Sequence, residues 1–329
     1  MIALNARAAA RPELGGVERW ARELAARLPA LGGYEVIRPP AALSHRTGHA
    51  WEQLVLPARA RGVRLLLNPA NLAPLAFPRN AVVIHDAAAL HQPGWYSPIY
   101  ARMQLRLLPL IARRARLVIT VSDFSRREIA ELLKVDALVV PGGVDERFTA
   151  DADPEPARAA LGLTRPYVLT VASRTKRKNL AALDATARRL ASQGIDLVAA
   201  GGERPQFRHD AGADQPAAKA VGHVPDAHLP GLYAGARAFV LPSWHEGFGL
   251  TCIEAMACGV PVVAARAGAL PETCGDAARY ADPFDHHEIA DQVIQALDDD
   301  ALRAAGPRHA ARYTWERTVA ELDALLKAA

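Results

Sequence analysis

The chain alternates short, continuous apolar runs with longer segments whose apolar positions recur at helical spacing. Continuous apolar runs are typical of strands in parallel sheets, because helices cover both faces of such sheets. A helix is predicted wherever apolar residues recur three or four positions apart. In the first half of the chain this pattern predicts strands at residues 2–4, 65–67, 81–84, 117–121 and 138–140, and helices at 16–28 and 99–115. A further helix begins at Ser122 or Asp123, whose side chains suit an N-cap.

A second series with the same alternation follows a polar, proline-containing stretch at 151–156. It predicts strands at 167–171, 196–200, 238–241 and 261–264, and helices at 179–192, 285–298 and 315–327. The fold class is therefore α/β, with two doubly wound Rossmann-like domains facing each other across a cleft. We predict a first domain at 1–150, a second at 151–312, and a C-terminal helix at 313–329 that packs back toward the first domain.

Composition agrees with a water-soluble globular protein. Half of the 329 residues are apolar, yet no apolar run approaches the ~20 residues that a membrane span needs. The chain opens directly on a strand, without the basic and apolar regions of a signal peptide. Its three cysteines lack the spacing of metal ligands and suit a reducing compartment. We expect a cytoplasmic protein without a metal site.

Charge is distributed unevenly along the chain. Residues 1–150 contain 20 Lys and Arg against 12 Asp and Glu, whereas the remainder has a net charge of −4. This asymmetry favours an anionic partner (a phosphate, a nucleic acid or a membrane surface) or merely reflects an arginine-rich genome. No aromatic residues interleave with the basic ones, which argues against nucleic acid. Five arginines around the predicted helix 99–115 suit an anionic phospholipid surface: Arg102, Arg106, Arg113, Arg114 and Arg116.

The segment 242–263 carries the strongest chemical signal. A glycine turn, Gly247-Phe248-Gly249-Leu250, separates a predicted strand from a predicted helix, which is where parallel units bind ligands. Glu246 precedes this turn, and Glu254 follows one turn into the helix. Paired hydroxyls of ribose and hexose donate hydrogen bonds to such carboxylates. Both residues could also be surface charges, although the apolar neighbours of Glu254 argue against that reading.

A cationic cluster, Arg174-Thr-Lys-Arg177-Lys178, lies between the strand at 167–171 and the helix predicted from residue 179. Cations are unfavourable at a helix N-terminus unless an anion lies among them. The cluster therefore predicts a phosphate or diphosphate site, and a solvated helix end is the alternative.

Two further signals lie in the first half of the chain. Gly15 and Gly16 separate the first strand from the first helix, where backbone N–H groups can approach an anion, although a tight turn needs glycine in any case. His85-Asp86 ends the strand at 81–84, at the sheet edge that lines ligand crevices. Alternatively, Asp86 caps a turn and His85 packs beneath it.

Together these residues resemble the GT-B glycosyltransferases, specifically the large retaining family 4 group with its bacterial mannosyltransferase-like members. The specific motif is the pair Glu246 and Glu254, separated by seven residues. Further matching segments in the second half are 221–226, 229–236, 255–263, 270–272, 282–283 and 314–317. Weaker matches in the first half are 5–7, 15–16, 85–86, 121–125 and 141–145.

The resemblance implies transfer of a hexose-type sugar from a GDP- or UDP-sugar to an acceptor hydroxyl, with retention and without metal or other cofactor. It implies a role in cell-surface polysaccharide or lipopolysaccharide synthesis, with a sugar or lipid-linked sugar as acceptor, at the inner face of the membrane. Glu254 would bind the ribose and Glu246 the transferred sugar. Lys178, with Arg174 or Arg177, would neutralise the diphosphate.

By the same resemblance, the backbone at Gly247, Phe248, Gly249 and Leu250 would assist donor binding. His85 would lie near the anomeric carbon, and Gly15 and Gly16 near the phosphate and acceptor. The chain departs from the family pattern at Ser173, where the phosphate-binding arginine normally lies, so either neighbouring arginine could serve. Two other functions stay open: a non-catalytic nucleotide-sugar-binding partner subunit, and a GT-B epimerase or hydrolase of sugar nucleotides.

Overall fold

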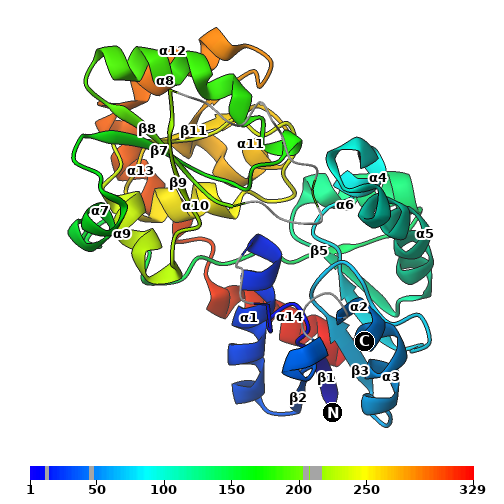
Figure 1. The fold of residues 1–329 in the computed structure, drawn as a ribbon. Coiled ribbons are helices and arrows are strands. Elements are labelled where there is room, and N and C mark those ends of the chain that lie inside the picture. Colours follow the sequence, from blue (N-terminus) through cyan, green and yellow to red (C-terminus); the bar gives the residue numbers. More distant parts are fainter. Residues whose placement is uncertain (12–14, 44–47, 203–206, 208–216) are drawn as a thin grey trace. The chain divides into compact units, whose positions relative to one another are not determined.

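The computed structural model describes residues 1–11, 15–43, 48–202, 207 and 217–329. Contacts divide the chain into two compact units (Figure 1). Unit 1 comprises residues 1–92, 101–143 and 315–329, and unit 2 comprises 93–100 and 144–314. Both units are α/β, as the alternating pattern predicts.

Among the described residues, unit 1 contains one parallel sheet of six strands in the order β2-β1-β3-β4-β5-β6. This order reverses direction between β1 and β3, where doubly wound sheets form a ligand crevice at the carboxyl ends of the strands. The strands are β1 Ile2–Asn5, β2 Tyr34–Ile37, β3 Leu65–Asn68, β4 Asn80–Val83, β5 Leu117–Thr120 and β6 Leu138–Val139.

The helices of unit 1 include the last one of the chain. Ser122 is the N-cap of α6, because its hydroxyl accepts a hydrogen bond from the backbone of Ser125 at 3.0 Å. The last helix, α14, joins unit 1 through Asp323, which accepts a hydrogen bond from the Tyr34 hydroxyl at 2.7 Å. The α-helices are α1 Gly16–Arg27, α2 Gly48–Leu54, α3 Leu56–Arg59, α4 Ala88–His91, α5 Pro98–Arg114 (whose first residues belong to unit 2), α6 Asp123–Leu133 and α14 Trp315–Ala328.

Unit 2 also contains a parallel sheet, with six strands among its described residues in the order β12-β11-β10-β7-β8-β9. Its order reverses between β7 and β10, so the loops that follow these two strands flank the expected ligand position. The strands are β7 Tyr167–Val171, β8 Asp196–Ala200, β9 Lys219–Gly222, β10 Ala238–Leu241, β11 Val262–Ala265 and β12 Ala278–Ala281.

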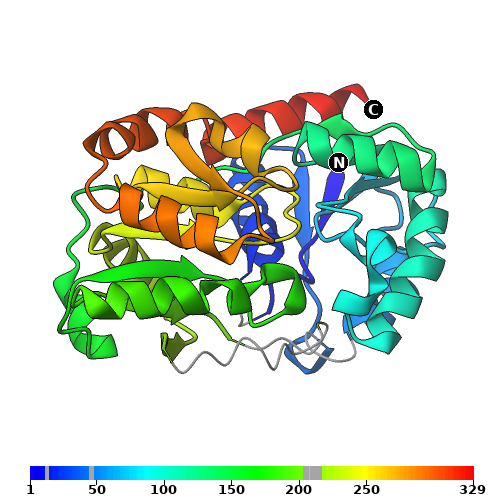
Figure 2. The same ribbon diagram turned by 90° about the horizontal axis from the view of Figure 1, so that it is seen from above.

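Helices cover the faces of this second sheet. Figures 1 and 2 both show α8 and α12 side by side. The α-helices of unit 2 are α7 Glu155–Leu161, α8 Asp184–Ser192, α9 Leu229–Ala234, α10 Leu250–Ala257, α11 Leu270–Cys274, α12 His286–Ala296 and α13 Asp300–Ala310. None of the described helices in either unit is long and apolar enough to cross a membrane.

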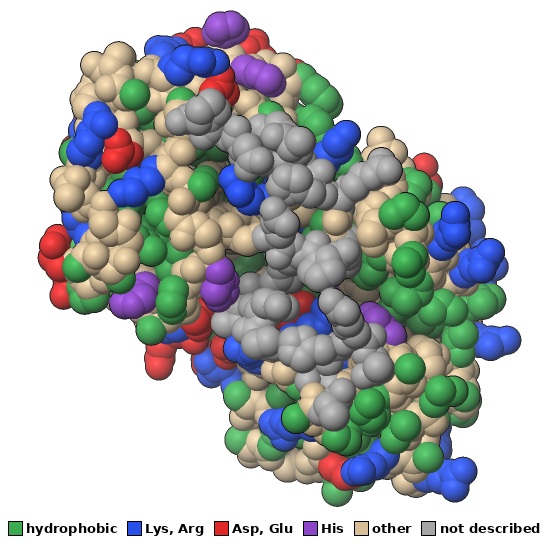
Figure 3. All heavy atoms as spheres, in the orientation of Figure 1, with side chains coloured by type: hydrophobic (Ala, Val, Ile, Leu, Met, Phe, Trp, Pro, Cys, Tyr) green, Lys and Arg blue, Asp and Glu red, His purple; other side chains and the backbone are tan. Residues whose placement is uncertain are grey.

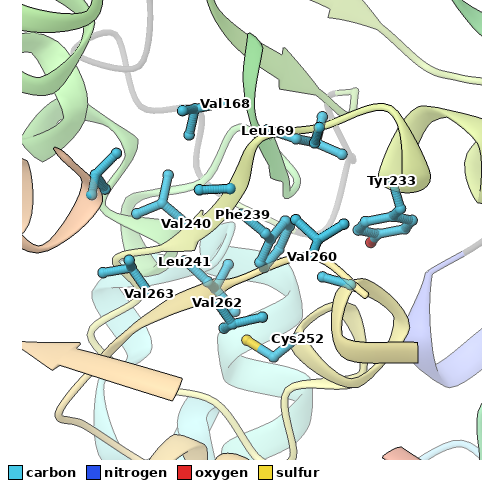
Figure 4. Packing of buried hydrophobic residues seen from close by; sticks show 14 of the residues in the cluster. Val168, Leu169, Tyr233, Phe239, Val240, Leu241, Cys252, Val260, Val262 and Val263 are labelled. Carbon is cyan, nitrogen blue, oxygen red and sulfur yellow. The ribbon is translucent and has the colours of Figure 1, made fainter. Parts of the chain in front are cut away.

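The core of unit 2 lies around the central strands. Phe239 and Leu241 of β10 pack with Val262 of β11, Cys252 of α10 and Tyr233 of α9 (Figure 4). All five side chains are fully buried. Burial of a large apolar side chain contributes about 1.5–3 kcal/mol, so this cluster fixes the strand ends that carry the site.

The predicted strands are confirmed, but three strands, β2, β9 and β12, were not predicted. Each of them lies at the edge of its sheet. Most of their residues are half-buried or exposed, and a charged residue interrupts or begins each of them, so they lack the continuous apolar run of a central strand.

The boundaries between the two units differ from the predicted boundary at 150/151. The longer segment of unit 2 begins at Val144 and ends at Thr314. These two residues form a bridge, and Val144 N donates to Tyr313 O at 2.9 Å. The polar stretch 151–156 lies inside unit 2, where α7 begins at Glu155. Proline and acidic residues are common in the first turn of a helix and also in linkers, so the two cannot be told apart from this sequence.

Candidate active site

A buried ionic cluster lies at the point where the strand order of unit 2 reverses. Lys178 Nζ lies 2.5 Å from one carboxylate oxygen of Glu246, and Arg177 lies 3.3 Å from the other. Arg177 also donates to the His245 carbonyl at 2.7 Å. The loop after β7 supplies both cations, and the loop after β10 supplies the carboxylate. The structure thus brings together two regions that are 68 residues apart in sequence.

The charged groups of this cluster shift one another's pKa. Burial opposes ionisation of Glu246, but the adjacent Lys178 and Arg177 outweigh it and hold the pKa of its carboxyl at about 2. Burial lowers the pKa of the Lys178 ammonium, while Glu246 acts in the opposite direction. Two cations thus flank one carboxylate, which leaves this buried region with a net positive charge that suits an anion.

One sequence argument about the cations is wrong. Lys176–Lys178 form a 3-10 turn, and α8 begins only at Asp184, so the cations do not lie at an α-helix N-terminus. Asn179 breaks the predicted helix because its backbone is left-handed, with φ of +52°. Its side-chain amide donates to the carbonyls of Pro242 at 3.0 Å and Pro283 at 2.7 Å. Asn179 therefore ties three loops of unit 2 together.

Arg174 occupies a different position from Arg177. It is partly exposed, and its backbone N–H donates to Gly202 O at 3.3 Å. Its side chain helps to line a hollow between β7, β8 and the turn at residues 180–183. Of the two candidate arginines, Arg177 is therefore the one that contacts Glu246, whereas Arg174 lines this neighbouring hollow.

The glycine turn after Glu246 has the predicted form. Gly249 is the N-cap of α10 with φ of +100°, and a Cβ there would lie 2.6 Å from a Leu270 methyl group. Leu250 begins the helix, while the half-buried Phe248 ring contacts Tyr313 edge-on at 5.4 Å. Gly247 and Gly249 are both buried.

Gly268 is a site residue that the sequence analysis missed. It follows β11 with φ of +59°, and a Cβ at this position would lie 2.6 Å from Glu246 N and 2.7 Å from Glu246 O. The next residue, Ala269, donates its N–H to Glu246 O at 2.9 Å. The backbone of Glu246 therefore packs directly against Gly268. In the sequence this glycine is simply one of many loop glycines, and no local signal links it to Glu246.

Glu254 lies in α10 and is buried. Its Oε2 accepts a hydrogen bond from the Tyr233 hydroxyl at 2.9 Å, and Tyr233 is itself fully buried in α9. This arrangement orients the carboxylate. It also explains the apolar surroundings that the sequence indicates, since the carboxylate has a buried hydrogen-bonding partner.

His85 lies in unit 1, just beyond β4, and is buried. Its Nε2 lies 2.8 Å from the Pro69 carbonyl and must donate to it, which makes Nδ1 the acceptor of the neutral ring. Burial lowers the pKa of His85, so the ring is neutral near pH 7. Asp86 accepts from Ala88 N at 3.1 Å and so caps a turn, while Trp20 contacts the His85 ring edge-on at 5.5 Å.

The glycines before α1 differ from each other. Gly15 N–H donates to the carboxylate of Glu18 at 3.1 Å, so this donor is occupied by the chain itself. Gly16 has open space where a side chain would lie. Contacts of Gly15 and Gly16 with an anion stay a prediction, and at Gly15 the anion would compete with Glu18 for the N–H.

A second buried ionic cluster in unit 1 was not predicted. Glu52 of α2 is fully buried and lies 3.0 Å from Arg7 Nε, and burial opposes its ionisation, but Arg7 lowers the pKa of its carboxyl. Asn5 donates to Glu52 at 2.6 Å and to Asn68 at 3.0 Å. Asn5 and Asn68 are the last residues of β1 and β3, where the strand order of unit 1 reverses, and Arg7 follows β1. Only Asn5 and Arg7 belonged to a recognised motif.

In the part of the chain that the structure describes, no three His, Cys, Asp or Glu residues cluster as metal ligands would.

The chain is similar to known proteins in sequence and in fold. Residues 165–299 match the model of the family "Glycosyl transferases group 1". O-antigen chain mannosyltransferase B of Escherichia coli is 33% identical over 257 residues, which is 72% of this chain and 67% of that protein. D-inositol 3-phosphate glycosyltransferase of Corynebacterium urealyticum is also 33% identical, over 58% of this chain, and the match spans half of its length.

Solved structures share the fold at lower sequence identity. Sucrose-phosphate synthase from Thermosynechococcus elongatus has a TM-score of 0.76 and 21% identity, over 99% of this chain and 98% of that one. HepE of Anabaena, solved with UDP-glucose, has a TM-score of 0.71 and 19% identity, over 100% of this chain and 99% of that one. This chain belongs to the glycosyl transferases group 1 family and has the GT-B fold.

Proposed function

We propose that this glycosyltransferase moves a hexose-type sugar from a nucleotide diphosphate sugar to an acceptor hydroxyl, with retention and without metal. The proposal places the reaction in cell-surface polysaccharide or lipopolysaccharide synthesis, with a sugar or lipid-linked sugar as acceptor. The observation that carries it is the buried Glu246–Lys178–Arg177 cluster, which combines charge for a diphosphate with a carboxylate for sugar hydroxyls. The mannosyltransferase relative and the UDP-glucose complex of HepE support a GDP- or UDP-sugar donor.

In this proposal Lys178 and Arg177 neutralise the leaving diphosphate, a task that many enzymes give to a metal ion. A lysine ammonium has three N–H donors, so Lys178 can hold Glu246 and a phosphoryl oxygen together. Glu246 then accepts from a hydroxyl of the transferred sugar. Arg174, at its neighbouring hollow, is the second candidate for the diphosphate.

Further contacts with the nucleotide sugar are proposed at the N-terminus of α10, at Glu254 and in unit 1. Backbone N–H groups at Gly249 and Leu250 lie where a helix attracts anions. Glu254, oriented by Tyr233, accepts from the ribose hydroxyls. From unit 1, His85 offers Nδ1 as an acceptor for a sugar hydroxyl, and Gly16 offers an uncrowded backbone to the phosphate or acceptor.

For retention, we favour a front-face reaction in which the leaving phosphate takes the proton of the acceptor hydroxyl. A double displacement would need a nucleophilic carboxylate beside the anomeric carbon. Asp86, the carboxylate next to His85, serves a turn by accepting from Ala88 N. The protein then contributes position and charge stabilisation rather than a covalent intermediate.

A thermal-shift screen against UDP-, GDP-, ADP- and dTDP-sugars tests the donor proposal. A donor at about 100 times its Kd stabilises the folded protein by about 2.7 kcal/mol, which raises Tm by several degrees. We expect a GDP- or UDP-sugar to give this shift, and sugar release that requires an acceptor. Release without any acceptor would favour a hydrolase or epimerase, and donor binding without turnover would favour a non-catalytic subunit. The absence of any shift would contradict nucleotide-sugar binding.

We also propose that α5 places the enzyme at an anionic membrane surface. Arg102, Arg106 and Arg113 are exposed on this helix, together with Leu105 and Leu110, which are 45% and 44% exposed. The helix contains no acidic residue. In Figure 3 basic and hydrophobic side chains lie next to each other over this edge of unit 1. Arginines attract anionic headgroups, and exposed leucines can enter the interface between headgroups and acyl chains.

Vesicle sedimentation tests this surface. We expect binding to vesicles with 30% phosphatidylglycerol at low salt, weakened by high salt because each basic residue contributes about 1 kcal/mol through screened electrostatics. Replacing Arg102 and Arg106 by glutamate should abolish binding, whereas the same change at Arg165 and Arg188 of unit 2 should not. Equal binding of both variants, or no binding by the natural protein at low salt, would refute the proposal.

A further inference from the structure

An exposed aromatic ring lies close to the ionic cluster of unit 2. Phe284, in the loop between β12 and α12, is 76% exposed. Its ring stacks on that of Trp244 with centroids 6.1 Å apart and planes 16° apart. Trp95, which belongs to the same unit, also stacks on Trp244, at 6.3 Å and 26°. We call Phe284 and Trp244 the aromatic shelf.

Hydrogen bonds within the loop hold the backbone that carries Phe284. The backbone of Phe284 donates to Asp282 Oδ1 at 2.9 Å, and Asp285 N donates to Asp282 O at 3.0 Å. Asp285 also caps α12 by accepting from His287 N and Glu288 N, both at 2.9 Å. These hydrogen bonds define the conformation in which the Phe284 ring lies at the surface, and with 76% of the residue exposed the ring is accessible to a ligand.

The same backbone contacts connect the shelf to the ionic cluster. Asn179 follows Lys178 and donates to Pro283 O, one residue before Phe284. Trp244 N donates to Arg177 O at 3.0 Å, and Trp244 precedes Glu246 by two residues. A ligand on the shelf is therefore held by the same loops that hold Glu246 and Lys178.

We propose that the aromatic shelf is a stacking subsite for a pyranose ring of the saccharide acceptor. One face of a pyranose exposes C–H groups of slight positive charge, which are attracted to the negative face of an aromatic ring. Exposed polar side chains surround Phe284, namely Asp282, Asp285, His286 and His287. A single ring among polar groups suits an amphipathic sugar, whereas an alkyl chain would need a continuous apolar surface. This subsite rests on the proposed transfer of sugar to a saccharide.

Saturation-transfer NMR on the full chain tests the subsite directly. The probes are methyl α-mannoside, mannobiose, maltose and lactose, with farnesyl phosphate as the lipid probe. We expect at least one saccharide to receive saturation at its ring C–H protons. That signal should be lost in Phe284→Ala, restored in Phe284→Trp, and unchanged in the control Leu138→Ala, which removes a 45% exposed side chain of unit 1. No saccharide signal from the natural protein, or one that survives in Phe284→Ala, overturns the proposal, as does Phe284-dependent binding of farnesyl phosphate alone.

Kinetics separate this subsite from the proposed function. With the donor identified by thermal shift, Phe284→Ala should raise KM for the saccharide acceptor about 3- to 10-fold, the range expected for one stacking contact. The donor-induced rise in Tm should match that of the natural protein. An unchanged acceptor KM overturns the subsite while the transfer activity stands. If no donor shifts Tm and no transfer occurs, the proposed function fails, and the NMR result still decides whether the shelf binds a saccharide.

Discussion

Replacing Glu246 by glutamine is expected to lower kcat for sugar transfer by about 100- to 1,000-fold, the range seen when one preorganised charged or hydrogen-bonding group is lost from an active site. Glutamine keeps the shape of the side chain but cannot balance the charges of Lys178 and Arg177, which lie 2.5 and 3.3 Å away. The measurement is steady-state transfer with the donor identified by thermal shift.

Glu321→Gln is the matched control for this variant. Glu321 pairs with Arg317 at 2.8 Å, but the two side chains are 37% and 65% exposed, so we expect unchanged transfer and less than 1 kcal/mol of lost stability. Removing Glu246 also leaves two buried cations side by side, so its melting curve must be recorded. A nucleoside diphosphate supplies the missing negative charge and should raise the Tm of Glu246→Gln at least as much as that of the natural protein. A folded Glu246→Gln with near-natural kcat would refute the assigned role.

Gly268→Ala is expected to destabilise the fold by about 2–5 kcal/mol and to reduce transfer strongly. The new methyl group would lie 2.6 Å from Glu246 N, so the backbone that carries the catalytic carboxylate must move. Two effects add here: an alanine in a left-handed conformation costs about 1–2 kcal/mol, and overpacking against backbone costs about 1–3 kcal/mol. Denaturant unfolding measures the loss of stability, and kcat measures the loss of transfer.

Gly162→Ala separates these two effects. Gly162 has φ of +60°, nearly that of Gly268, but an added Cβ meets only the end of Lys219 at 4.0 Å. Gly162→Ala should therefore lower the free energy of unfolding by about 1–2 kcal/mol and leave transfer unchanged. If Gly268→Ala were no more harmful than Gly162→Ala, the contact between Gly268 and Glu246 would have no functional weight.

Much of the fold was predictable because central strands have a local signature. A strand covered on both faces is a continuous apolar run, and β7, β8 and β10 were predicted with their observed bounds. Three described edge strands, β2, β9 and β12, have no such run and were missed for that reason, whereas the edge strand β6 lies in the apolar run 138–140 and was predicted.

The site was predictable in residue type and less so in geometry. Glu246 and Lys178 stood out because an acidic residue at a glycine turn and a cationic cluster are unusual in the sequence. The helix predicted at 179–192 exists as α8, but its predicted start was wrong, because the side-chain amide of Asn179 binds the Pro242 and Pro283 carbonyls and Asn179 has a left-handed backbone. Those carbonyls are 63 and 104 residues away in sequence, so no local pattern could have indicated them.

By itself the sequence determined the α/β class, the central strands and the residues that carry charge and glycine into the site, since these depend on local periodicity and composition. Only the tertiary structure decided that Arg177 and Lys178 share the carboxylate of Glu246, that Gly268 supports its backbone, and that Phe284 stacks on Trp244. The physical reason is the parallel sheet itself. Its crossover connections bring together loops that are far apart in sequence, at the carboxyl ends of strands whose order the sequence does not display.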